Sequence, residues 1–100
     1  MTRFGELIRQ LRVENGYPLR IVAAKLNIDQ AILSKIERGQ RKANKEQINI
    51  LANFFNYDEK KLKIVFLSDI VAYELIDEED SAEVLKVAEE KIKYLRAKNE

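Results

Sequence analysis

The chain of 100 residues contains no cysteine and no histidine. Without cysteine it has neither a disulfide framework nor a thiolate zinc site. Without histidine it lacks the side chain that most often serves as a general base or a metal ligand. No stretch approaches the roughly 18 apolar residues of a membrane span. The N-terminal stretch is amphipathic and lacks the apolar core of a signal peptide, so we expect a cytoplasmic protein. Together these absences lead us to expect no cofactor, no metal site and no membrane partner.

Turn-forming residues are also scarce, because the chain has only three glycines and one proline. Leu, Ile, Ala, Lys and Glu are abundant instead, and most of these residues favour helices. The composition therefore predicts an all-α protein. A chain of this length is enough for one domain with a single core, together with a small appendage.

The net charge of +1 conceals a difference between the two halves of the chain. Residues 1–50 hold ten Lys and Arg against five Asp and Glu, which gives +5. Residues 51–100 hold eight against twelve, which gives −4. A basic first half suggests a polyanion as partner, although a chance imbalance would explain the charge alone equally well.

The apolar residues near the N-terminus are spaced for one face of a helix: Phe4, Leu7, Ile8 and Leu11. This spacing predicts a helix over about residues 3–14, which Asn15-Gly16 ends. Pro18 fits the first turn of a second helix, where its missing N–H costs nothing, and that helix ends near Asn27.

Two further short helices follow in the first half. Asp29 can cap the third helix, and Gly39 suits its C-terminal turn. Asn44 and Gln47 have the spacing of a capping box at the start of the fourth. The inward positions of the fourth helix are Ile48, Leu51, Ala52 and Phe55.

The second half has a different pattern. From Leu62 to Ile76, apolar residues occupy nearly every side of the predicted helix, and such a helix must be covered all round. After the acidic run 77–80, another helix carries one apolar stripe: Leu85, Ala88, Ile92 and Leu95. Asp80 and Glu83 have capping-box spacing, which favours two helices. Because no glycine or proline interrupts the stretch, one continuous helix over 58–98 is the alternative.

The third helix has two distinct sides at 100° per residue. Ile28, Leu33 and Ile36 share one side. The other side is small and polar: Gln30, Ala31, Ser34 and Arg38. Such a side suits the DNA major groove, where glutamine can bridge adenine and small apolar groups meet thymine methyl groups. The cations just beyond the helix would meet phosphates: Arg41, Lys42 and Lys45. The alternative is an ordinary solvated polar face.

Residues 4–56 resemble the helix-turn-helix domain of the Cro/C1 repressor and xenobiotic-response-element-type regulators. The resemblance is carried by Arg12, Val22-Ala23, Leu26, Ile28, the Leu33-Ser34-Lys35-Ile36-Glu37-Arg38-Gly39 run and Leu51-Ala52. It implies a five-helix-type, phage-repressor-like DNA-binding domain over 1–57 with a C-terminal helical extension over 58–100. It also implies that Arg12 pairs with Glu37, which ties the first helix to the end of the recognition helix.

The resemblance further implies which side chains touch DNA. The expected base-reading residues are Gln30, Ala31, Ser34 and Lys35. The expected phosphate contacts are Arg20, Arg38, Gln40, Arg41, Lys42 and Lys45. Family members commonly begin the second helix with a Ser or Thr cap followed by Gln, which grip a phosphate. Here Pro18 and Leu19 stand in those places, and we expect Arg20 to compensate in part. Ile32 either faces the core or reaches the DNA edge.

The apolar second half predicts a dimer interface within residues 58–100. One stripe is formed by Val65, Phe66, Ile70 and Tyr73. The other is formed by Ile64, Leu67, Val71 and Leu75. One stripe can rest on the fourth helix, and the other then faces the last helix or a second subunit. Alternatively, the C-terminal helices only cap the core of a monomer.

The leading hypothesis is therefore a sequence-specific transcriptional regulator that binds double-stranded DNA as a homodimer on a roughly two-fold operator. The alternative is an antitoxin or adaptor whose C-terminal helices bind a protein partner. The compact architecture also resembles regulators of restriction–modification systems. We do not expect an enzyme, because the only carboxylate cluster, 77–80, points in several directions and has no His, Cys or glycine-rich phosphate loop beside it.

Overall fold

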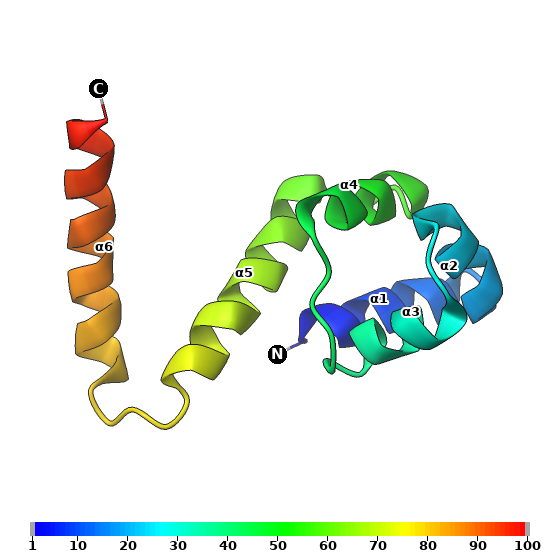
Figure 1. Cartoon of the computed structure of the whole chain (residues 1–100), viewed down its shortest axis with the longest axis horizontal. Helices are drawn as coiled ribbons and strands as arrows, with labels where there is room; N and C mark the ends of the chain where they lie inside the picture. Colours follow the sequence, from blue (N-terminus) through cyan, green and yellow to red (C-terminus); the bar gives the residue numbers. More distant parts are fainter. Residues whose placement is uncertain (1, 100) are drawn as a thin grey trace. The chain divides into compact units, whose positions relative to one another are not determined.

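The computed structural model describes residues 2–99 and is all-helical over that range, as the composition predicts (Figure 1). The described residues form six helices: α1 (Phe4–Glu14), α2 (Leu19–Leu26), α3 (Gln30–Glu37), α4 (Lys45–Phe54), α5 (Glu59–Leu75) and α6 (Ser81–Lys98). The chain therefore breaks between α5 and α6, and the alternative of one continuous helix over 58–98 is wrong.

The helix ends predicted from local signals are present. Gly39 follows α3 with φ +75°, a left-handed conformation that glycine adopts without strain. Its N–H donates to the Ile36 carbonyl at 3.1 Å, and the Gln40 N–H donates to the Lys35 carbonyl at 2.8 Å. These two bonds satisfy carbonyl groups at the end of α3. They also fix the direction in which the chain leaves that helix.

The capping box of α4 is complete. The Gln47 N–H donates to Asn44 Oδ1 at 2.8 Å, and the Asn44 N–H donates to Gln47 Oε1 at 2.9 Å. Two backbone donors that the helix cannot satisfy are thereby paired.

Three details of the predicted caps are wrong. Pro18 is the N-cap residue of α2, one position before the first helical residue. In the described part of the chain, Asp29 and Asp80 do stand at the N-caps of α3 and α6, but neither side chain makes a cap hydrogen bond. The capping box expected for Asp80 and Glu83 therefore does not form. Asp80 has φ −93° and ψ 25°, outside the extended conformation that usually aims an N-cap side chain at the first turn.

The hydrophobic core takes residues from α1 to α4, from the segment before α4 and from α5. Its buried apolar residues are Phe4, Ile8, Val22, Ala23, Leu26, Leu33, Ile36, Ala43, Ile48, Leu51, Ala52 and Leu62. Most are inward positions of the predicted helices. Phe55, expected inside α4, is instead its half-buried C-cap residue.

The first half of α5 packs into this core. Leu62 is fully buried, and the Phe66 ring meets the Phe4 ring edge-on with centroids 5.2 Å apart. One turn further on, Asp69 Oδ2 accepts a hydrogen bond of 2.7 Å from the backbone N–H of Phe4, the first residue of α1. Asp69 thus acts as a distant N-cap for α1, whose own N-cap residue, Arg3, makes no side-chain cap bond.

The described chain divides into two compact units, of which the first runs through Ile70 and the second begins at Val71. In the first unit, Val65 and Phe66 pack against the core, whereas Ile64 and Leu67 are exposed. In the second unit, none of the described residues of α6 is buried. The division of roles between residues 1–57 and 58–100 remains a prediction. No helix in residues 2–99 is long and apolar enough to cross a membrane.

Candidate DNA interface

Helices α2 and α3 form a helix-turn-helix unit, and α3 packs against both α2 and α1 (Figure 1). The turn between them passes through Asn27, which has the left-handed φ of 56°. Leu33 and Ile36 bury the inner side of α3. The partly buried Ile32 also packs against the core, so its side chain is shared between the core and the surface.

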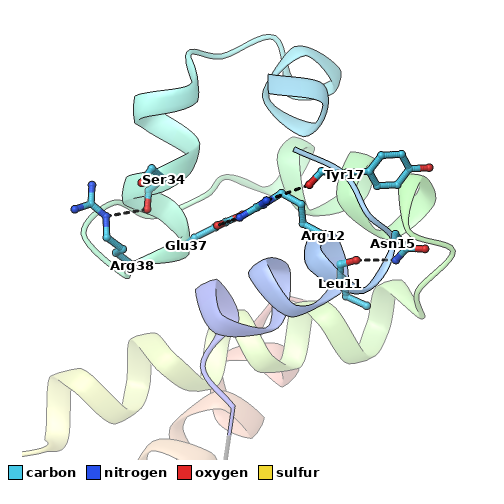
Figure 2. A network of polar contacts seen from close by, with 7 residues as sticks. All are labelled: Leu11, Arg12, Asn15, Tyr17, Ser34, Glu37 and Arg38. Atoms are coloured by element: carbon cyan, nitrogen blue, oxygen red, sulfur yellow. Dashed lines mark hydrogen bonds and ion pairs between the residues drawn. The ribbon is translucent and has the colours of Figure 1, made fainter. Parts of the chain in front are cut away.

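The opposite side of α3 is exposed. Gln30, Ala31 and Lys35 are exposed and Ser34 is half-buried. At 100° per residue these four positions share one side of the helix. The structure therefore brings the predicted base-reading residues together on a single face of α3. Arg38 is the C-cap residue of α3, and its Nε donates to the Ser34 carbonyl at 3.3 Å (Figure 2).

Cations and amides follow α3 on a short segment that is held at both ends. Its exposed members are Arg38, Gln40, Arg41 and Lys42, and the exposed Lys45 opens α4. The Gly39 turn anchors the start of this segment, and the Asn44 capping box anchors its end. Between them Ala43 is buried in the core, a contact that the sequence analysis missed because a lone alanine in a polar segment gives no periodic signal.

Arg12 and Glu37 form a buried ion pair between α1 and the last residue of α3 (Figure 2). Arg12 Nε donates to Glu37 Oε2 at 2.8 Å, and Nη2 donates to Oε1 at 3.0 Å. Nη1 donates to the Tyr17 carbonyl at 3.0 Å. The side chains of Arg12 and Glu37 are 12% and 4% exposed.

This arrangement is a structural clamp. Two parallel bonds between a guanidinium and a carboxylate fix orientation as well as distance. The third bond, to Tyr17, ties the same guanidinium to the segment before α2. The hydrogen bonds that Arg12 donates to Glu37 raise the pKa of Arg12 above its ordinary value, although burial opposes the rise. The carboxylate of Glu37 therefore joins the end of α3 to α1 through Arg12.

Gly5 also positions the end of α3, and the sequence analysis did not identify it. The residue is buried in the first turn of α1. A Cβ added there would lie 2.5 Å from the Glu37 carbonyl oxygen, and closer still to that of Ile36. Only glycine allows the α1 and α3 backbones to approach this closely. A single glycine early in a helix pattern gives no signal of such an approach.

Neither Arg20 nor the acidic run 77–80 belongs to α3 or to the segment that follows it. Arg20 is exposed in the first turn of α2. The acidic run 77–80 lies in the break between α5 and α6. Among residues 2–99, no group of three or more carboxylates is placed to hold a metal ion.

Comparison with known proteins identifies the family. A family model described as helix-turn-helix matches residues 8–62, which is more than half of the chain. No curated protein and no solved structure matched. The matched range begins in α1 and ends at Leu62, the α5 residue that completes the core. The chain therefore belongs to the Cro/C1-type helix-turn-helix family of DNA-binding regulators.

Proposed function

We propose that the protein is a sequence-specific transcriptional regulator that binds double-stranded DNA as a homodimer. One observation carries the DNA-binding part of this proposal. The exposed side of α3 is small and polar, cations follow it directly, and the helix itself is clamped to α1. Such a helix can enter a groove without rearranging.

The dimensions of α3 support its role as the recognition helix. It has eight residues, and at a rise of 1.5 Å per residue it is about 12 Å long, close to the width of the major groove. In this role Gln30 donates to and accepts from the edge of an adenine, and the Ala31 methyl group contacts a thymine methyl. Ser34 and Lys35 read or flank the next base pairs.

The cations beyond α3 supply affinity without sequence preference. Arg38, Arg41, Lys42 and Lys45 meet phosphates on either side of the groove, and Gln40 donates a neutral hydrogen bond there. At α2, Pro18 lacks both an N–H and a polar side chain. Arg20, two positions further along the chain, is exposed, and we assign it the phosphate contact on that side.

Exposed apolar side chains support self-association. In α5 they are Ile64, Leu67, Val71 and Tyr73, and in α6 they include Val84, Leu85, Ile92 and Leu95. Monomers rarely leave this much apolar surface in contact with water. A second copy related by a two-fold axis covers the surface and also pairs two recognition helices for an operator with two half-sites. Because Val65 and Phe66 already pack within the protomer, we assign the interface mainly to the other predicted residues.

Selection of bound duplexes from a random oligonucleotide pool tests this function. We expect a motif with two inverted half-sites whose centres are about 10 base pairs, or a multiple of a helical turn, apart. The Gln30→Ala variant, selected in parallel, should lose preference at one base pair in each half-site. Failure to enrich any sequence would contradict sequence-specific regulation and would favour a module that binds a protein partner.

A further inference from the structure

The apolar stripe of α6 has the spacing of a coiled-coil seam. Leu85, Ala88, Ile92 and Leu95 are separated by three, four and three residues, which is the alternation of the a and d positions of a heptad. Leu85, Ile92 and Leu95 are 47%, 48% and 57% exposed. A stripe of this kind on an exposed 18-residue helix is built to meet another helix along its length.

Charge is segregated along the same element. Four acidic residues, Asp77, Glu78, Glu79 and Asp80, lie in the segment directly before α6, and Glu83 lies in its first turn. The basic residues Lys93, Arg96 and Lys98 lie in the last two turns of α6, and Lys91 lies near its middle. Lys86, Glu89 and Glu90 lie between these ends, and Glu89 is paired with Lys93 of its own helix at 3.3 Å. The apolar stripe is therefore flanked by negative charge at one end and by positive charge at the other.

We propose that α6 pairs with the α6 of a second copy of the chain in an antiparallel orientation. The proposal rests on the homodimer proposed above and specifies how that homodimer is joined. Antiparallel pairing sets the acidic end of each helix beside the basic end of the other, whereas parallel pairing sets like charges together at both ends. The two helix dipoles are also opposed in the antiparallel arrangement, which favours it further.

The seam itself fits this orientation. In the symmetric antiparallel register, Leu85 lies opposite the partner's Leu95, and Ala88 lies opposite the partner's Ile92. The first pair places two leucines against each other, and the second places a small residue against a large one. Side chains of facing helices interdigitate when small and large residues alternate in this way. The two-fold axis passes near residue 90, where Glu89 and Lys91 each approach their own copies. These two like-charge contacts oppose the pairing, whereas the unlike charges near the two ends of the helices favour it.

Cysteine cross-linking decides the orientation, because the natural chain contains no cysteine that would interfere. Ala82→Cys and Arg96→Cys place a thiol beside the seam near either end of α6, and Lys91→Cys places one near the axis. With a short bis-maleimide, we expect Lys91→Cys to cross-link with itself. Ala82→Cys or Arg96→Cys alone should give almost no dimer, but an equimolar mixture of the two should cross-link after subunit exchange. Self-cross-linking of Ala82→Cys without cross-linking of the mixture would establish parallel pairing and overturn the proposal.

Charge reversal gives an independent readout. Arg96→Glu with Lys98→Glu should weaken the dimer about tenfold, since several flanking pairs each contribute a few tenths of a kcal/mol. Adding Glu79→Lys and Asp80→Lys should restore it. The matched control, Lys86→Glu with Glu90→Lys on the side away from the seam, should leave dimerisation unchanged. A dimer that is indifferent to all of these reversals would overturn the proposal.

Sedimentation and DNA binding separate this proposal from the proposed function. A chain that sediments as a dimer and binds a two-fold operator, but cross-links in the parallel pattern, overturns only the antiparallel pairing. A chain that stays monomeric at micromolar concentration overturns the homodimer and the α6 pairing together. Antiparallel cross-linking of a dimer that selects no DNA sequence would support the pairing and contradict the proposed regulator.

Discussion

Removal of either partner of the Arg12–Glu37 clamp should cost a large part of the protein's stability. The two side chains are 12% and 4% exposed, so Glu37 would be left with a buried, unpaired charge in Arg12→Ala. Breaking such a pair typically costs about 3–5 kcal/mol, against a total stability of about 5–15 kcal/mol for a domain. Glu37→Ala should cost less than Arg12→Ala, because Arg12 is more exposed and retains its hydrogen bond to the Tyr17 carbonyl.

Urea denaturation of the two single variants and of the double variant measures this cost. We expect the double variant to lose clearly less than the sum of the singles, because it strands no charge. Glu6→Ala is a matched control: it breaks the Arg3–Glu6 pair, which is as short as 2.6 Å but lies between side chains that are 54% and 52% exposed. That loss should be much smaller than the loss in either single variant of the clamp, because solvent screens the exposed pair. Additive losses at Arg12 and Glu37 would refute the reasoning, because they would mean that the two side chains do not stabilise each other.

The clamp should also be insensitive to alkaline pH. Glu37 raises the pKa of Arg12, so the stability it contributes is present below the ordinary arginine pKa and is lost only as the pH rises through the raised value. The urea midpoint of the wild type should therefore not fall relative to that of Arg12→Ala between pH 7 and 10. A selective fall of the wild-type midpoint over this range would contradict the stabilising role of the Arg12–Glu37 pair.

Four further single-residue variants give additional tests. Gly5→Ala should lower the free energy of unfolding in urea by about 1–3 kcal/mol, because the new methyl group overlaps the α3 backbone. Alanine prefers helices to glycine by about 1 kcal/mol, so a stabilisation of that size would show that no close approach exists. Asp69→Ala should cost about 1 kcal/mol through loss of the distant cap on Phe4, and an unchanged urea midpoint would remove that role. Gln30→Ala should weaken binding to the selected operator by about 1–3 kcal/mol and should weaken binding to random DNA much less. Lys42→Ala should weaken binding to both DNAs and should reduce the slope of log affinity against log salt concentration by about one unit. Equal losses on both DNAs in fluorescence anisotropy would exclude Gln30 as a base reader.

Features that depend on neighbouring residues were predictable from the sequence. The Gly39 turn and the Asn44–Gln47 capping box involve residues within a few positions of one another, and both are present. Residue spacing also indicated which side of α3 would be buried. The Asp29 and Asp80 side chains show the limit of such reasoning, since a suitable residue at the N-cap position does not determine the direction of its side chain.

Features that join distant parts of the chain were not predictable from local pattern. Spacing alone did not pair Arg12 with Glu37, 25 residues apart, and only the family resemblance suggested that contact. The bond from Phe4 to Asp69 spans 65 residues and had no sequence signal. Because α5 is apolar on nearly every side, its sequence did not reveal which stripe would meet Phe4. Leu62 of α5 is a fully buried core residue, so truncation of the chain after Tyr57 would remove part of the core.

The spacing of the two half-sites tests the central claim most directly. On the selected operator, inserting about five base pairs between the half-sites rotates one of them by half a turn, so a dimer can no longer dock both recognition helices on the same side of the duplex. We predict a loss of affinity of at least about tenfold by fluorescence anisotropy, while the same insertion outside the half-sites has no effect. Unchanged affinity at the rotated spacing would show that the chains bind independently and would contradict a two-fold homodimer.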